Sequence, residues 1–287
     1  MSPIKREVVI GDCRLLLGDC RDILPNLHGV DAVVTSPPYD DLRDYGPEFD
    51  GLDWRRVIEL LHGTLSDGGV CVWNVSDAVR DGSETGTSFR QAIHAQSCGF
   101  LLHDTMIYEK EQACFGSNHG YLQCFEFMFV WAKGKPKAIN LLRDRKNVRA
   151  RVESVAKGGI AKDGTKAGRT KRQADEYGRR KNIWRYGVGG GTVDHPAVMP
   201  EAMARDHILS WTNEQDVVLD PFMGSGTTGA ACAKSGRAFV GIELHEPYFD
   251  LACERIRAAY AQPDLFVAAN QSEPKPIQQP LFSEGAA

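Results

Sequence analysis

The chain has 287 residues, of which 42% are apolar and 25% charged, and its formal net charge is −4. This composition is typical of a soluble globular protein: no apolar run approaches the roughly 20 residues that span a bilayer, and the N-terminus lacks the apolar stretch of a secretory signal. The eight cysteines form no C-x-x-C pair, which argues against a metal site or a disulfide framework and suits a reducing cytoplasm.

Strands and helices alternate along the chain. Short apolar or β-branched runs bounded by Gly, Pro or Asp predict seven strands, at 13–19, 30–36, 68–76, 100–110, 124–134, 216–221 and 237–244. Apolar residues at helical spacing predict helices at 53–65, 87–98, 200–212, 227–235 and 247–261. This interleaving favours a largely parallel α/β sheet. The tail from residue 262 contains four prolines and is predicted to be irregular.

The segment 135–190 is basic, rich in glycine and short of periodic apolar positions, which predicts a loop-rich recognition segment. Residues 133–185 hold 18 Lys and Arg against 5 Asp and Glu, a local net charge of +13, and the remaining residues carry −17. A basic insert on an acidic body is the pattern expected of a contact with nucleic acid, and a solvated basic loop is the alternative. The candidates for phosphate and groove contacts are Lys171, Arg172, Arg179, Arg180, Lys181 and Arg185.

The stretch "DPFMGSGTTG", residues 220–229, follows an apolar strand. Gly224, Gly226 and Gly229 spell G-x-G-x-x-G, the dinucleotide-binding fingerprint. That fingerprint normally opens a domain, yet only 58 residues follow it here. The other strands of a complete sheet must therefore precede residue 135, so the two halves of the sheet follow a circularly permuted order.

The stretch "TSPPY" follows the strand predicted at 30–36, at the edge where open α/β sheets bind ligands. Pro37 and Pro38 fix φ and lack N–H groups, so they leave rigid carbonyl acceptors. Ser36 adds a polar acceptor and Tyr39 a flat ring, which together suit a planar ring that carries an amino group. A plain rigid turn is the alternative interpretation.

Together, these two motifs resemble the permuted β branch of the S-adenosylmethionine-dependent DNA amino-methyltransferase family, over about residues 12–260. In that branch the S/D/N-P-P-Y/F/W motif comes first, a target-recognition region follows, and F-x-G-x-G comes late. "GDC" (18–20), "HPAVMPEAM" (195–203) and "GIEL" (241–244) match in the same order. The resemblance implies a circularly permuted Rossmann-like methyltransferase sheet of about seven strands, flanked by helices.

The same resemblance implies how the chain is divided. The catalytic half would occupy 1–134, the basic target-recognition insert 135–190, the cofactor-binding half 191–261 and the irregular tail 262–287. Double-stranded DNA would be the partner, without any membrane contact. The family also allows a homodimer and a cognate restriction enzyme.

The resemblance further implies the roles of individual residues. Asp19 would receive the adenine amino group of S-adenosylmethionine, and Glu243 its ribose hydroxyls. Ser36 and the Pro37 carbonyl would accept hydrogen bonds from the exocyclic amine of a flipped base, and Tyr39 would stack on that base. The full cofactor set would be Asp19, Cys20, His195, Pro196, Asp220, Pro221, Phe222, Gly224, Ser225, Gly226, Thr227 and Glu243.

Several alternatives stay open at this point. Serine before Pro-Pro slightly favours N4-cytosine over N6-adenine as the target. The literal glycine fingerprint would also suit an oxidoreductase that binds NAD. A methyltransferase acting on RNA or on a protein amide uses a similar turn, and an inactive DNA-binding relative is a further alternative.

Overall fold

The computed structural model describes residues 2–39, 53–111, 121–148, 153–156, 170–188 and 199–261. The chain forms two compact units, a large one of Met1–Asn140 with Asn182–Ala287 and a small one of Leu141–Lys181. His195, Pro196 and the tail from residue 262 lie outside the described residues. No helix in the described part of the chain is long and apolar enough to cross a membrane.

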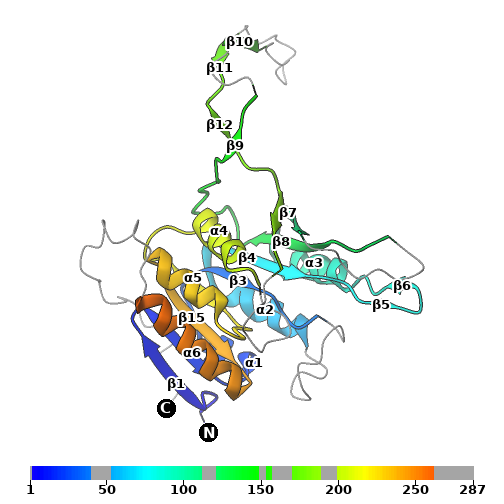
Figure 1. The fold of residues 1–287 in the computed structure, drawn as a ribbon. Helices are drawn as coiled ribbons and strands as arrows, with labels where there is room; N and C mark the ends of the chain where they lie inside the picture. Colours follow the sequence, from blue (N-terminus) through cyan, green and yellow to red (C-terminus); the bar gives the residue numbers. More distant parts are fainter. Residues whose placement is uncertain are drawn as a thin grey trace. The chain divides into compact units, whose positions relative to one another are not determined.

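The large unit is built on a nine-stranded sheet with the order β1-β2-β15-β14-β3-β4-β8-β7-β13 (Figure 1). From β2 to β4 all neighbours are parallel, whereas β1 is antiparallel to β2, and β8 to both β4 and β7. The strands are β1 (Arg6–Ile10), β2 (Cys13–Leu17), β3 (Val30–Thr35), β4 (Leu65–Val75), β7 (Leu101–Lys110), β8 (Phe125–Ala132), β13 (Ile183–Tyr186), β14 (Val217–Asp220) and β15 (Ala238–Glu243).

The structure confirms the α/β class and all seven predicted strands, and it adds β1 and β13 to the sheet. Both extra strands lie at the edges, where a strand needs little apolar sequence. In β1 exposed and half-buried residues alternate. β13 lies inside the segment predicted to be loop-rich, and pairs in parallel with β7. Its Trp184 is buried and packs against His207 with ring centroids 4.5 Å apart, so this tryptophan anchors the return of the chain to the sheet.

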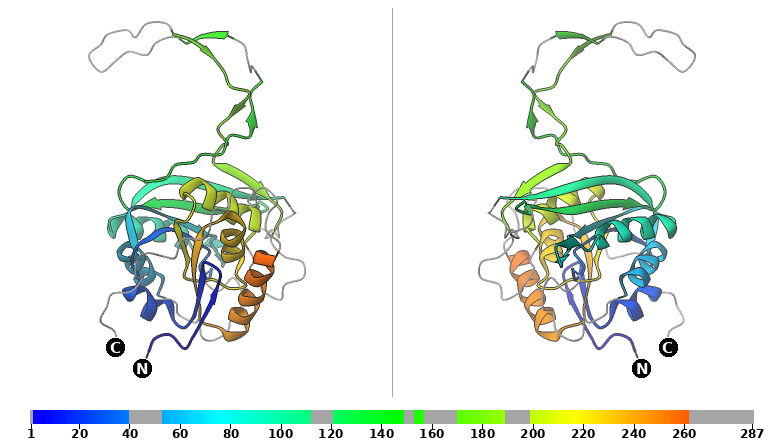
Figure 2. Two further views of the ribbon diagram at one scale, coloured as in Figure 1. Left: turned by 90° about the vertical axis from the view of Figure 1, so that its left-hand side faces the viewer. Right: turned by 90° about the vertical axis from the view of Figure 1, so that its right-hand side faces the viewer.

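Helices cover both faces of the sheet (Figure 2). α2 packs with α1 and α3 on one face, and α5 packs with α4 and α6 on the other. All five predicted helices are confirmed. The helices are α1 (Cys20–Ile23), α2 (Trp54–Thr64), α3 (Thr87–Ser97), α4 (Glu201–Trp211), α5 (Thr227–Ser235) and α6 (Glu246–Ala261), with a 3₁₀ turn η1 (Leu24–Asn26) and a short hairpin β5 (Val79–Arg80) and β6 (Ser83–Glu84).

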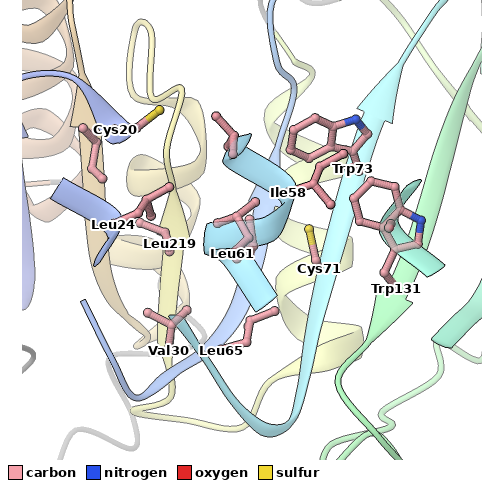
Figure 3. Close-up of a cluster of buried hydrophobic side chains, with 14 of the residues drawn as sticks. Cys20, Leu24, Val30, Ile58, Leu61, Leu65, Cys71, Trp73, Trp131 and Leu219 are labelled. Carbon is pink, nitrogen blue, oxygen red and sulfur yellow. The ribbon is translucent and has the colours of Figure 1, made fainter. Parts of the chain in front are cut away.

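The main core lies between the sheet and the α1–α2 layer (Figure 3). α2 turns Ile58 and Leu61 inward, and both are fully buried. The indoles of Trp73 on β4 and Trp131 on β8 stack with centroids 5.4 Å apart. Full burial of an aliphatic side chain such as Ile58 or Leu61 stabilises the fold by about 1.5–3 kcal/mol. This core therefore stabilises the strands whose ends form the site.

The permuted chain order has one consequence for the site. β14 comes from the C-terminal part of the chain, yet it lies between β15 and β3, with Leu219 beside Val33. The glycine loop after β14 and the S-P-P-Y turn after β3 therefore emerge from adjacent parallel strands.

The small unit consists of two short antiparallel strand pairs. β9 (Arg145–Lys146) pairs with β12 (Tyr177–Gly178), and β10 (Glu153–Ala156) pairs with β11 (Thr170–Gln173). Within this unit Arg180 donates from Nε to Asp144 at 2.7 Å. The basic segment predicted to be loop-rich thus contains a two-stranded ribbon.

Candidate active site

Four adjacent parallel strands end at the same edge of the sheet. Asp19 and Ser36 follow β2 and β3, whereas Asp220 and Glu243 end β14 and β15. The Gly18 amide donates to the Glu243 carbonyl at 2.8 Å, which holds two of these strand ends together. Polar groups from opposite ends of the chain thus meet where open α/β sheets bind their ligands.

The glycine loop joins Asp220 to α5, and its glycines have different roles. Gly224 and Gly226 adopt positive φ angles of 51° and 80°, which L side chains rarely adopt. A Cβ on Gly229 would lie 2.7 Å from the Phe239 ring and 2.5 Å from Ile256. Gly229, the third glycine of the fingerprint, therefore lets α5 pack closely on β15 and α6.

Glu243 caps this loop from the neighbouring strand. Its two carboxylate oxygens accept one amide each, from Gly224 at 2.7 Å and His245 at 2.8 Å. Burial raises the pKa of Glu243 to about 7, although these amides favour the ionised form. A carboxylate offers about four lone-pair positions, and the amides of Gly224, His245 and Leu244 interact with part of them.

Asp220 is turned into the protein. It accepts hydrogen bonds from the hydroxyls of Thr35 at 2.7 Å and Thr228 at 2.8 Å, and from the Phe222 amide at 3.1 Å. Burial raises its pKa to about 6. Asp220 therefore joins the end of β3 to the glycine loop and to the first turn of α5.

Asp19 caps α1 and pairs with Arg21. It accepts from the Arg21 amide at 2.8 Å and from its guanidinium at 2.6 Å. Partial burial opposes ionisation, but these bonds outweigh it and lower the pKa of Asp19. Cys20, the next residue, is buried in the core.

Arg255 on α6 holds the loop from behind. It donates to the hydroxyls of Ser225 at 2.6 Å and Thr227 at 3.3 Å. The sequence did not predict a role for Arg255, because an arginine in an amphipathic helix carries no signal of what it contacts.

The start of the glycine loop packs on the core. Phe222 meets Trp73 edge to face at 6.2 Å between ring centroids, and the preceding Pro221 is buried.

The S-P-P-Y turn is tied to β4 and β8. The hydroxyls of Ser36 and Tyr39 lie 2.7 Å apart, and Tyr39 donates to Glu126 at 2.9 Å. Asn74 donates to the same Tyr39 oxygen at 2.6 Å. Tyr39 is only 4% exposed, so its ring must become more accessible before a base can stack on it. Pro37 is buried and Pro38 half-buried.

The basic candidates divide between the two units. Lys171 and Arg172 lie on β11, and Arg179, Arg180 and Lys181 follow β12, all in the small unit. Arg185 lies on β13 of the large unit, where it pairs with Glu109 at 2.9 Å. The tertiary structure therefore places five of the six in one compact unit.

Comparisons with known proteins agree with this architecture. The chain is 47% identical over 251 residues to the orphan methyltransferase M.BamHII of Bacillus amyloliquefaciens, covering 84% of this chain and 91% of that protein. It is 29% identical to the type II methyltransferase M.SmaI of Serratia marcescens, covering 87% and 92%. Among solved structures, the cytosine-N4-specific PvuII DNA methyltransferase shares the fold, with a TM-score of 0.64, 15% identity and coverage of 90% and 95%.

A DNA modification methylase of Thermus thermophilus, solved in complex with S-adenosyl-L-methionine, also shares the fold, with a TM-score of 0.57, 24% identity and coverage of 85% and 94%. The family model described as DNA methylase, for N6 and N4 methyltransferases, matches residues 30–254. That match includes both the S-P-P-Y turn and the glycine loop. The chain belongs to the N6/N4 DNA methylase family, the DNA amino-methyltransferases.

Proposed function

We propose that this protein is a site-specific DNA methyltransferase that transfers a methyl group from S-adenosylmethionine to the exocyclic amine of a flipped base. One observation carries the proposal: Ser36 and the glycine loop follow adjacent parallel strands, joined by the Thr35–Asp220 hydrogen bond. A donor held by the loop and an amine held by the turn would then be neighbours, which is what a direct displacement requires.

S-adenosylmethionine is the methyl donor, and the loop residues suit it. The Glu243 carboxylate at the end of β15 suits a ribose diol, whose two hydroxyls donate hydrogen bonds. Bound there, the donor supplies an electrophilic methyl group. His195 and Pro196 would close the methionine end.

The turn supplies acceptors for the amine. An exocyclic amine is a weak nucleophile because its lone pair is delocalised into the ring. Hydrogen bonds from its protons to Ser36 and to the Pro37 carbonyl would favour a pyramidal nitrogen with its lone pair directed at the methyl group. The Tyr39 ring would stack on the flipped base, which offsets part of the few kcal/mol that flipping costs.

Double-stranded DNA is the proposed substrate, and the basic insert its proposed recognition element. A two-stranded ribbon such as β10–β11 fits the major groove, and Lys171 and Arg172 lie on it. Serine in the motif slightly favours N4-cytosine over N6-adenine. The free cysteines of the described residues are compatible with activity in a reducing cytoplasm. The names of the type II relatives suggest a cognate restriction enzyme as a partner. A homodimer is compatible with this assignment.

The family match over residues 30–254 disfavours the NAD-dependent oxidoreductase. The glycine loop also comes late in the chain, and among the described residues only one strand, β15, follows it. An RNA or protein-amide substrate remains a competing acceptor for the same turn.

Two experiments test the proposal. The protein is expressed in a host that lacks DNA methylation, and genomic DNA is sequenced with modification-sensitive reads. We expect N4-methylcytosine or N6-methyladenine in one short motif, and unmodified DNA would reject a DNA substrate. Thermal unfolding is then followed with S-adenosylmethionine and with NAD. Stabilisation by NAD alone would reject the methyltransferase assignment.

A further inference from the structure

A buried polar cluster lies beside the S-P-P-Y turn and belongs to neither motif. It consists of Lys110 at the end of β7, Glu126 on β8 and Asn74 on β4. Lys110 pairs with Glu126 at 2.9 Å, and Asn74 donates to Glu126 at 2.7 Å. Glu126 and Asn74 are both buried. Burying a carboxylate is costly unless it is paired and hydrogen-bonded, and Lys110 and Asn74 meet both conditions here.

The register of the sheet explains why these residues meet Ser36. Asn74 lies opposite Met128, two residues from Glu126, and Glu126 lies opposite Tyr108, two residues from Lys110. Residues two apart on a strand, and residues directly opposite across an antiparallel pair, share a face. The three side chains therefore project from one face, at the edge where β3 and β4 end.

The hydrogen bonds determine the direction in which each proton is donated. The Tyr39 hydroxyl donates its single proton to Oε2 of Glu126, whose Oε1 pairs with Lys110. The Tyr39 oxygen can then only accept from Ser36. Ser36 donates its proton to Tyr39 and keeps its own lone pairs. Through the Tyr39 hydroxyl, the Glu126 carboxylate thus leaves the Ser36 oxygen as a hydrogen-bond acceptor. An exocyclic amine that donates a hydrogen bond needs such an acceptor.

Asn74 gives a second, independent observation. Its Nδ2 donates to both Tyr39 and Glu126, which fixes the orientation of the amide. Its Oδ1 is buried, and no described residue donates a hydrogen bond to it. An unpaired buried acceptor is costly, and an incoming amino group would satisfy it.

We propose that Glu126 is a positioning residue for methyl transfer, which orients the Ser36–Tyr39 hydroxyl pair and takes up, through it, the proton that the amine loses. This inference rests on the proposed function. As the amine nitrogen bonds to the methyl carbon, the carbon–sulfur bond breaks and sulfur keeps the electron pair. One amine proton then passes to Ser36, the Ser36 proton passes to Tyr39, and the Tyr39 proton passes to the Glu126 carboxylate.

The test uses the full-length protein, unmethylated genomic DNA and methyl-labelled S-adenosylmethionine under single-turnover conditions. Glu126→Gln keeps the shape but loses the charge, and Tyr39→Phe keeps the ring but breaks the hydroxyl chain. We expect each variant to be about 100-fold or more slower with unchanged donor affinity. The double variant should be no slower than the slower single variant, because both changes interrupt one chain.

A pH profile separates this role from a merely structural one. If Glu126 takes up the proton, the rates of the wild-type protein and of Glu126→Gln should have pH profiles of different shape, whereas a merely structural loss lowers the rate by the same factor at every pH. The matched control is Glu7→Gln, which breaks the Glu7–Arg14 ion pair of 2.7 Å at the far edge of the sheet and should leave the rate unchanged.

The outcomes are distinguishable. A wild-type protein that transfers no label refutes the proposed function itself. Wild-type transfer with an equally fast Glu126→Gln variant, or with additive effects of the two changes, refutes the role of Glu126. If Glu126→Gln does not fold, Tyr39→Phe decides, because it leaves the Lys110–Glu126 pair in place; a wild-type rate in Tyr39→Phe then overturns the inference.

Discussion

The hydroxyl of Thr35 donates a hydrogen bond of 2.7 Å to the Oδ1 atom of Asp220, although the two residues lie 185 positions apart in the chain. Both side chains are buried. Thr35 immediately precedes the S-P-P-Y turn, and Asp220 begins the glycine loop. The bond therefore joins the two halves of the proposed active site.

Thr35→Val should lower the free energy of unfolding by about 1–3 kcal/mol, because it removes a hydrogen bond to a buried carboxyl group without changing the shape of the side chain. Denaturant unfolding at pH 8, where Asp220 is ionised, measures the loss. Thr105→Val, at an exposed position of β7, is the control. A Thr35→Val variant as stable as this control would contradict the prediction.

Donor affinity should depend on the ionisation of Glu243. Burial raises the pKa of this carboxyl to about 7 in the free protein, and a ribose diol binds the ionised form. Below pH 7 the protein must release a proton to bind, so affinity for S-adenosylmethionine should weaken about tenfold from pH 8 to pH 6. Calorimetric titration across this range measures it. Glu243→Gln should bind more weakly at pH 8, and its affinity should vary less with pH.

Gly229→Ala should destabilise the fold by about 1–3 kcal/mol, because the added methyl group would overlap Phe239 and Ile256. Donor affinity of the folded protein should stay within about twofold, since the clash lies behind the loop. Gly63→Ala is the matched control: this helical glycine has open space around its Cα, and alanine there should stabilise by about 0.5–1 kcal/mol. A selective loss of donor binding in Gly229→Ala would instead place Gly229 in the binding site.

Tyr39→Ala should abolish most turnover while donor binding persists. The variant loses both the hydroxyl that joins Ser36 to Glu126 and the ring proposed to stack on the base. Loss of stacking alone, about 1–3 kcal/mol, corresponds to about a 5- to 150-fold weaker hold on the flipped base. Methylation rate and calorimetry are measured side by side. An unchanged rate would reject both roles of Tyr39.

Replacing Arg179, Arg180 and Lys181 together by Ser should weaken DNA binding and flatten its salt dependence. Each phosphate contact contributes about 0.9 to the slope of log K against log salt concentration, so the slope should fall by about 2–3. Binding constants are measured at several salt concentrations between about 50 and 200 mM, where such contacts change the affinity strongly. Replacement of Lys5, Arg56 and Arg257, exposed on the large unit, is the control. Equal slopes for both triple variants would exclude the insert as the DNA contact.

The chemistry-bearing motifs could be predicted because they are local. Proline, glycine and serine in "TSPPY" and "DPFMGSGTTG" act through backbone geometry within a few residues. The seven predicted strands and five predicted helices were confirmed for the same reason, since apolar periodicity is a short-range property. β1 and β13 were missed because an edge strand needs little apolar sequence.

The contacts of Glu126 could not be predicted from sequence. In the run "CFEFMFVWAKG" it reads as one polar residue in an apolar strand, and nothing nearby in the chain indicates Tyr39, Asn74 or Lys110 as its neighbours. The same is true of Arg255, whose partners Ser225 and Thr227 lie about thirty positions earlier. Such contacts depend on which strands pair and in which register.

The amino-acid sequence by itself determined the motifs, the permuted order of the two halves and the methylase family to which they point. Only the tertiary structure decided that Asp220 binds Thr35, that Gly229 serves packing, and that a buried carboxylate lies behind the S-P-P-Y turn. The physical reason is the range of the interactions. Backbone preferences and side-chain periodicity act over a few residues, whereas strand pairing brings together groups that are distant in the chain, and the register of that pairing decides which side chains share a face.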